Sequence, residues 1–450
     1  MEGLPNPRRR WAALTLLVGI GMSVLDSSMS NVALPTIARE LNQSAAAVVW
    51  IVNAYGLTLV MTLLPMSAIG ERTGFKRLFK YGLLLFTVAS VASSIAPSLP
   101  WLLVCRVLQG LGGSAIMCLF GALVRHIYPP QMMARGIGIN AMMVGVTSVL
   151  GPTIGSFILS VSSWHWIFAI NIPIGLLALL GVKYLPDVAP IKGRFDWLSA
   201  CLSMLTVGLI IVGIDYLSTY TWQSLGAIVM GILTGVVLMR RSNQQVAPLV
   251  PVDLLKISSL RFAIAASLCT FSAQMATFIS LPFYLQQTLH RSQSSVGMLM
   301  AAWPMGAALI ALIAGRMSNI YPVAILSGLG AGAMATGIAI IVLMPEHASD
   351  IWLMLAMGLA GVGFGFFQTP NNRVIIGSAP RHRAGALGGL QATTRVFGQT
   401  FGAAMVASAF SLSVSVGPTL GLIVGITFAS VAVLVNVVRH RQAGASRSEG

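Results

Sequence analysis

The sequence predicts an all-α polytopic membrane protein, and three features point to that fold class. Hydrophobic residues make up 56% of the 450-residue chain, charged residues only 8%, and the mean hydropathy is +0.84. A water-soluble chain of this length needs far more polar side chains to cover its surface. Long apolar runs recur along the whole chain, and the basic residues gather in alternate loops between them.

The apolar runs predict fourteen membrane-spanning helices, because each is near the roughly 20 residues that cross about 30 Å of hydrocarbon. The first run follows Arg8–Arg10 and superficially looks like a signal peptide. It contains an acid and lacks a small-residue cleavage site, so we expect it to be retained. The predicted spans are residues 11–31, 47–69, 78–96, 99–124, 136–160, 165–183, 197–216, 223–239, 261–289, 295–315, 322–344, 351–372, 385–412 and 416–438.

An even number of spans places both termini on the same side of the membrane. Of the 27 Lys and Arg residues, 23 fall on that side, whereas Arg39 and Arg291 fall on the other and Arg106 and Arg395 lie within spans. This positive-inside bias predicts cytoplasmic termini. It also accounts for the net charge of +16, so we expect the lipid bilayer, and no nucleic acid, as the partner of these charges.

Similar loops recur in the two halves of the chain. Arg125 and Arg135 are ten residues apart around two prolines, and Arg373 and Arg383 are ten apart around Pro380. Two similar bundles can expose a cleft to each side of the membrane in turn, which is typical of alternating-access transporters. The repeat predicts an N-terminal six-helix bundle over residues 1–185, two extra transmembrane helices with a cytoplasmic linker over 186–260, and a C-terminal six-helix bundle over 261–450.

Asp26 is the only carboxylate that the predicted spans place deep in the bilayer. An ionised side chain near the middle of a span costs roughly 3 kcal/mol on insertion scales, so a function is expected for it. Asp26 lies about 22 Å from the cytoplasmic end of its span, and Arg106 lies about 10 Å from the opposite surface, which gives them a similar depth. We predict that Arg106 tunes the proton affinity of Asp26; a static buried pair that only joins two helices is the alternative.

Five segments resemble signatures of one transporter family. They are LDSSMSNVALP (25–35), LPMSAIGERTGFKRL (64–78), RVLQGLGGSA (106–115), GIGINAMMVGVTSVLGPTIGS (136–156) and WHWIFAINIPIG (164–175). The chain thereby resembles the major facilitator superfamily, and within it the fourteen-span drug:proton antiporter branch, over essentially its whole length. Glu71 stands where the family usually has Asp, and His165 where the branch usually has Arg.

The resemblance implies the major facilitator fold, with two six-helix bundles plus two extra transmembrane helices, and a proton-coupling role for the first-span acid. It also implies a conformational latch on the cytoplasmic side, for which a simple topology-setting basic loop is the alternative. The latch candidates are Glu71, Arg72, Gly74, Lys76 and Gln109. A fifth-span helix typical of exporters is implied as well, with tight helix packing as the alternative. Its residues are Gly138, Gly151, Pro152 and Gly155.

Several polar or aromatic side chains within spans are candidates for substrate binding, because polar groups in hydrocarbon need a partner or a wet cleft. Interhelical hydrogen bonding or packing is the alternative for each. The candidates are Asp26, Asn53, Tyr55, Gln274, Trp303, Gln368 and Arg395.

Together these features predict a proton-coupled antiporter in the bacterial inner membrane that exports amphiphilic, cationic drugs or toxic small molecules. No enzyme or nucleotide-binding motif is present, so we expect no catalytic residue, no metal and no cofactor besides the coupling proton. A monomer is expected, and the sequence leaves a periplasmic adaptor open. The alternatives are a dedicated exporter or importer of one metabolite on the same fold, and a non-transporting membrane receptor.

Overall fold

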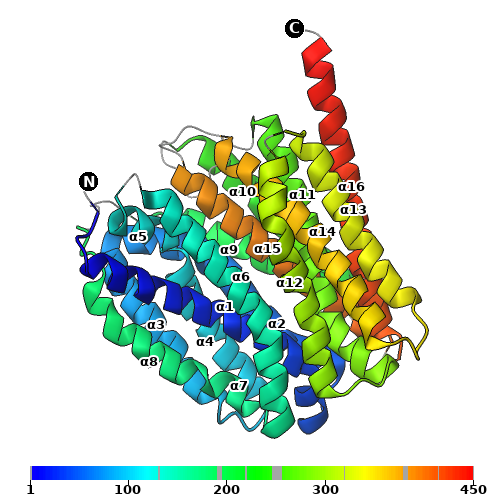
Figure 1. Ribbon diagram of the computed structural model, residues 1–450. Coiled ribbons are helices and arrows are strands. Elements are labelled where there is room, and N and C mark those ends of the chain that lie inside the picture. The colour runs from blue at the N-terminus through cyan, green and yellow to red at the C-terminus, as the bar shows by residue number, and fades with distance from the viewer. Residues whose placement is uncertain are drawn as a thin grey trace. The chain divides into compact units, whose positions relative to one another are not determined.

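The computed structural model is helical throughout the part of the chain that it describes (Figure 1). The described residues are 3–129, 132–189, 195–217, 220–245, 256–318, 320–378, 384–413 and 415–448. Residues 246–255 of the expected cytoplasmic linker lie outside them. The helices are α1 (Arg8–Glu40), α2 (Ala45–Thr73), α3 (Phe75–Ser93), α4 (Leu99–Met117), α5 (Phe120–Ile127), α6 (Met133–Val161), α7 (His165–Ala169), α8 (Asn171–Gly181), α9 (Trp197–Asp215), α10 (Thr221–Asn243), α11 (Ser258–Phe283), α12 (Gln293–Met317), α13 (Val323–Leu343), α14 (Asp350–Gly377), α15 (Ala384–Leu412) and α16 (Gly417–Ser448).

Each expected span coincides with one helix or with two consecutive helices, so the all-α prediction is confirmed. The fourth span is divided into α4 and α5, and the sixth into α7 and α8, while the end of α11 tightens into a π-helical turn at Tyr284–Thr288. Within the described residues, eleven helical segments are long and apolar enough to cross a membrane.

The chain divides into two compact units, each described here by itself. Unit 1 comprises residues 1–43, 50–213 and 225–250, and unit 2 comprises residues 44–49, 214–224 and 251–450. Most of α9 and α10 therefore belongs to unit 1.

In unit 1, α1 is the central element and most of its length is buried. It packs against α6 and α8, while α3 packs against α4 and α8. The α1–α6 contact depends on glycine, since a Cβ atom on Gly151 would lie within 3.0 Å of Ser28, and one on Gly155 would lie 3.3 Å from the Cα atom of Met29. Small residues let helix backbones approach closely where the bilayer supplies no hydrophobic drive for association.

In unit 2, α11 packs against α15 and α16, α14 packs against α12 and α13, and α13 packs against α16. Gly361 lets α14 approach the backbone of α12, because a Cβ atom there would collide with the carbonyl group of Trp303. The side chain of Trp303 is 1% exposed.

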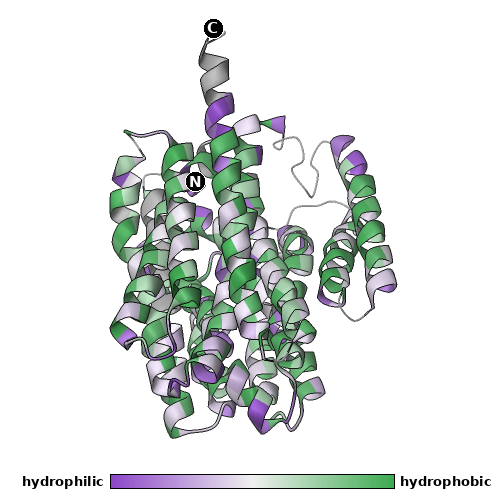
Figure 2. Cartoon of the chain, turned by 90° about the vertical axis from the view of Figure 1, so that its right-hand side faces the viewer, coloured by the Kyte–Doolittle hydropathy of each residue, from purple (hydrophilic) through white to green (hydrophobic). Residues whose placement is uncertain are grey.

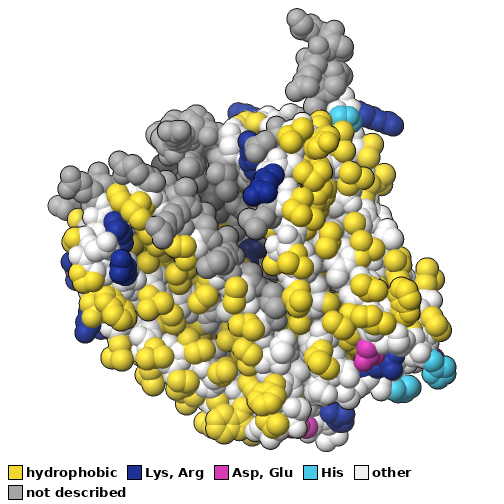
Figure 3. Space-filling view, viewed as in Figure 1, with side chains coloured by type: hydrophobic (Ala, Val, Ile, Leu, Met, Phe, Trp, Pro, Cys, Tyr) yellow, Lys and Arg dark blue, Asp and Glu magenta, His cyan; other side chains and the backbone are white. Residues whose placement is uncertain are grey.

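The outward faces of the helices are apolar. Leu177 and Leu180 of α8 are 67% and 71% exposed, and Leu309 of α12 is 74% exposed. Hydrophobic residues follow the helices along their length in Figure 2, and they are spread over much of the face seen in Figure 3. An exposed apolar surface of this extent is incompatible with water and fits the acyl chains of a bilayer.

Asp196 joins α9 to α10 at one end of these helices. Its carboxylate accepts hydrogen bonds from the amide and the hydroxyl of Ser199 at 3.1 and 2.6 Å, and from Gln245 at 2.6 Å, and it forms an ion pair with Arg241 at 3.1 Å. Burial acts to raise the pKa of Asp196, but these hydrogen bonds together lower that pKa well below its ordinary value. The carboxylate is therefore ionised at neutral pH and holds the two helices together.

The close approach of α6 to α1 predicts that a methyl group added at Gly151 lowers the stability of the protein. Gly151→Ala should destabilise the protein by about 1–3 kcal/mol, because the new Cβ atom must push Ser28 and α1 away. Thermal unfolding of the purified protein measures the change. Gly226→Ala in α10 is the matched control, since nothing lies within 4 Å of a Cβ atom at that position. Equal melting temperatures for the two variants would contradict this packing.

Candidate ion-coupling site

Asp26 and Arg106 meet inside unit 1. Asp26 lies in the middle of α1, Arg106 lies in the first half of α4, and both side chains are fully buried. Nη1 of Arg106 donates to Oδ2 of Asp26 at 2.6 Å. The similar depth predicted from sequence therefore corresponds to a direct ion pair.

Arg106 makes further contacts that hold its guanidinium in place. Nε donates to the carbonyl oxygen of Ile51 in α2 at 2.9 Å, and Nη1 also donates to Oε1 of Gln109 at 2.9 Å. The ring centroid of Tyr55 lies 4.4 Å from the guanidinium carbon, and that of Phe168 lies 5.7 Å from it. Cation–π contacts of this kind are stronger in a desolvated site.

The second carboxylate oxygen of Asp26 is also occupied. Nδ2 of Asn171, at the start of α8, donates to Oδ1 of Asp26 at 2.7 Å. Nε2 of Gln109 donates to the hydroxyl oxygen of Ser90 in α3 at 2.8 Å. The resulting buried network, comprising Asp26, Ser90, Arg106, Gln109 and Asn171, joins α1, α3, α4 and α8, and the carbonyl oxygen of Ile51 links it to α2.

Sequence reasoning missed Asn171 and Ser90 as members of this network. Asn171 lies within the WHWIFAINIPIG segment, where it is the one amide in an apolar stretch. Nothing in the sequence marked Ser90 as a member of the network. A serine in a span commonly donates to a carbonyl oxygen of the preceding helical turn, and Ser90 does so to Phe86.

The charges of the network balance in this structure. Taking two ions out of water costs several kcal/mol for each ion, and their attraction offsets this only when extra hydrogen bonds satisfy the remaining atoms. Asp26 has both oxygens bonded, whereas Nη2 of Arg106 has no hydrogen-bond partner among the described residues. The guanidinium of Arg106 is also held by its amide, carbonyl and aromatic contacts.

The seven substrate-binding candidates divide between the two units. In unit 1, Tyr55 bonds to the hydroxyl of Ser23, and Asn53 is 1% exposed. In unit 2, Gln274 lies 3.5 Å from Gln399, and Trp303 packs edge-on against Phe278. The remaining two candidates, Gln368 of α14 and Arg395 of α15, are half-buried. Of the seven candidates, Asp26 and Tyr55 lie close to each other because both contact Arg106.

Unit 2 contains a buried cation, Arg439, just beyond the predicted end of the last span at residue 438. The helix α16 continues to Ser448, and Arg439 is only 7% exposed. It donates to Oδ1 of Asn371 at 3.0 Å, and Asn371 donates to Ser267 and to the carbonyl oxygen of Ala263. The hydropathy pattern ends at the charge, whereas the helix turns this side chain back onto α14.

Comparisons with known proteins agree with this architecture. The family profile of the Major Facilitator Superfamily matches residues 16–403 and residues 262–449. The chain belongs to the major facilitator superfamily. Two solved structures that are 14–16% identical to the chain share its fold. The TM-score is 0.72 for a POT family transporter in complex with a thioalcohol-conjugated peptide. It is 0.70 for an inward-facing bacterial homologue of the human lysosomal transporter Spinster. Each alignment covers 97% of this chain and at least 96% of the other.

Several curated major facilitators are similar over nearly the whole chain. The uncharacterized transporter YebQ of Escherichia coli (strain K12) is 41% identical, and the alignment covers 98% of both proteins. The riboflavin transporter RibZ of Clostridioides difficile (strain 630) is 29% identical over 91% of this chain and 90% of its own length. The multidrug efflux pump LfrA of Mycolicibacterium smegmatis is 28% identical over 91% of this chain and 84% of its own length. A transporter is therefore supported, whereas the substrate differs among the relatives.

The facilitator loop between α2 and α3 packs against the segment that precedes α9. Gly74 separates the two helices with φ of +96°, a conformation that glycine adopts without strain. Arg72 lies 5.4 Å from the ring centroid of Phe195, and Nζ of Lys76 lies 4.0 Å from a carboxylate oxygen of Asp187. The other two latch candidates make no contact of this kind with the described residues. Glu71 is exposed, and Gln109 lies in the buried network.

The fifth-span signature residues all lie in α6. Gly138, Gly151, Pro152 and Gly155 follow one another along this helix. Gly151 and Gly155 contact Ser28 and Met29, which lie within one turn of Asp26 on α1. This helix therefore packs directly against the part of α1 that carries the buried carboxylate.

Removing one partner of the ion pair is predicted to cost more stability than removing both partners. Arg106→Gln should destabilise the protein by about 3–5 kcal/mol, because it leaves a buried carboxylate without its cation. The double variant Asp26→Asn/Arg106→Gln should lose less stability, since no charge remains unpaired. Thermal unfolding of the purified variants measures both changes, and Lys80→Gln, at an exposed position on α3, controls for loss of a positive charge. Equal losses in the single and double variants would show that the pairing contributes little.

Proposed function

We propose that this facilitator is a proton-coupled antiporter that exports amphiphilic, cationic small molecules by alternating access. The observation that supports this best is the fully buried pair of Asp26 and Arg106 in the core of unit 1. A purely structural role would be served as well by apolar side chains of similar volume, which often replace buried ion pairs without loss of stability. A carboxylate retained at such a site is a candidate for a group that gains and loses a proton.

The network suggests how protonation is coupled to a change of conformation. When Asp26 is ionised, it binds Arg106 and Asn171 and so connects α1 to α4 and α8. When it is protonated, the attraction to Arg106 is lost, and α1 can separate from α4 at a smaller cost. A cationic substrate near the carboxylate would favour the ionised form and a proton the neutral one, so the two compete for one site.

The surrounding elements have proposed roles in the same cycle. The α2–α3 loop, through Glu71, Arg72, Gly74 and Lys76, acts as the conformational latch, and α6, through Gly138, Gly151, Pro152 and Gly155, moves with α1. Asn53, Tyr55, Gln274, Trp303, Gln368 and Arg395 are the proposed substrate contacts.

The membrane arrangement is part of the proposal. The Lys and Arg bias places both termini in the cytoplasm. The chain then belongs to the fourteen-span drug:proton antiporter branch and acts in the bacterial inner membrane as a monomer that needs no cofactor besides protons. The relatives named as multidrug resistance proteins and efflux pumps support this assignment.

Dedicated transport of a single metabolite is the second candidate. It is favoured by the riboflavin transporter RibZ, which is as similar to this chain as the efflux pump LfrA is. The buried ion pair serves either function, since both need coupling to an ion gradient.

Asp26→Asn should abolish proton-driven efflux while the protein still folds, because the amide keeps the shape of the carboxyl group and cannot titrate. The measurement is efflux of cationic dyes from proteoliposomes under an imposed pH gradient. Glu346→Gln, which removes an exposed carboxylate from a loop, should behave like the wild type. Export against a gradient by the Asp26→Asn variant would contradict the coupling role and favour a static pair.

A substrate panel separates the two candidate functions. A multidrug exporter should transport several unrelated amphiphilic cations, and each should compete with the others, because they share one site. The measurement is inhibition of dye efflux by each compound in the same proteoliposomes. Transport of one compound, with no competition from the rest, would establish the dedicated function instead.

A further inference from the structure

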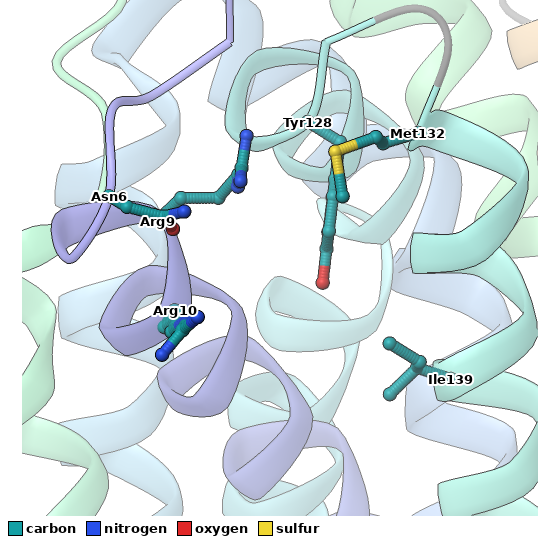
Figure 4. Close-up of a pocket in the computed structure, with 6 residues that line it drawn as sticks. All are labelled: Asn6, Arg9, Arg10, Tyr128, Met132 and Ile139. Carbon is teal, nitrogen blue, oxygen red and sulfur yellow. The ribbon is translucent and has the colours of Figure 1, made fainter.

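A cavity of about 180 Å³ lies in unit 1 beside the start of α1, outside the ion-coupling site (Figure 4). Sites for drug-sized ligands measure about 300–1,000 Å³, so this cavity suits a smaller group. It is lined by Asn6, Arg9, Arg10, Tyr128, Met132 and Ile139.

The cavity is enclosed between the start of α1 and the α5–α6 region. The amide of Leu4 donates to the carbonyl oxygen of Ile127 at 3.0 Å, which holds the N-terminal segment against the end of α5. The start of α1 forms one side, and Tyr128 and Ile139 of the α5–α6 region form the other. Figure 4 shows Arg9 reaching toward Tyr128 across the opening.

The lining is strongly basic. The guanidinium groups of Arg9 and Arg10 make no ion pair or side-chain hydrogen bond with the described residues, and no described acid lines the cavity. The first turn of α1 contains no acidic residue either. Neighbouring Arg8 differs, because it is bonded to the carbonyl oxygens of Tyr184 and Leu185. Two unneutralised arginines facing one cavity favour an anion with several acceptor oxygens.

Aromatic side chains follow the two arginines of the cavity at the start of α1. Trp11 follows the two arginines directly, is 50% exposed, and stacks on Tyr184 with 5.9 Å between ring centroids. Exposed tryptophan and tyrosine at the end of a span mark the membrane–water interface. Leu14, one turn further along α1, is 48% exposed.

We propose that this cavity binds the phosphate group of an anionic membrane lipid. Arg9 and Arg10 contact the phosphate oxygens, while the lipid tails lie against the exposed side chains of Trp11 and Leu14 at the start of α1. Basic pockets between helices on the cytoplasmic side are suited to acidic headgroups, and the charge bias of the chain places this cavity on that side. A bound lipid would tie the N-terminal segment, α1, α5 and α6 together.

The test uses the full-length chain in neutral detergent, with phosphatidylglycerol or phosphatidylcholine added and thermal unfolding and native mass spectrometry as readouts. Phosphatidylglycerol should bind and raise the melting temperature, and phosphatidylcholine should not. Because each basic group near an anionic surface contributes about a fivefold gain in affinity, Arg9→Gln/Arg10→Gln should weaken binding about 25-fold. Lys80→Gln/Arg240→Gln, which removes two exposed charges elsewhere in the unit, should bind like the wild type.

Inorganic phosphate and glycerol phosphate are tested in parallel. Failure of both to stabilise the protein supports a lipid, whereas stabilisation by either to the same extent as the lipid would overturn the lipid assignment in favour of a soluble phosphate. Wild-type affinity for phosphatidylglycerol in the double variant would overturn the site itself. If the double variant does not purify, Arg10→Gln alone, at an exposed position, should weaken binding about fivefold.

Discussion

An ionised carboxylate buried among hydrocarbon side chains must have every oxygen bonded and its charge neutralised, and this requirement organises unit 1. Asp26 obtains its cation from α4 and its amide donor from α8, and Arg106 in turn binds a carbonyl oxygen of α2. Gln109 extends the network to α3. Helices far apart in sequence are thus held around one negative charge, so a change in that charge affects all of them.

The two units meet the problem of buried charge differently. In unit 2, Arg439 is buried against an amide, Asn371, which is itself held by α11. An arginine cannot lose its proton in the physiological range, so this arrangement has a fixed charge. In unit 1 the buried arginine is instead paired with a carboxylate, and the proposed coupling chemistry is assigned to that pair.

Hydropathy predicted the helices, and helical rise predicted that Asp26 and Arg106 lie at a similar depth, which made them candidate partners. Asn171 and Ser90 could not be assigned, since a polar side chain within a span says that it needs a partner but not which one. The predicted last span ends before Arg439 because a charged residue usually ends a hydrophobic run, whereas α16 continues to Ser448. Gln109 is predicted as a latch residue, and only the structure shows that its side chain bonds to Arg106 and Ser90.

The contacts of the α2–α3 loop connect it to residues that precede α9. Asp187 and Phe195 belong to the segment that leads into α9, yet they contact Lys76 and Arg72. Asp196, the next residue, fastens α9 to α10. The start of the hairpin of α9 and α10 therefore lies against the α2–α3 loop, so a displacement of either one is expected to disturb the contact of Arg72 with Phe195.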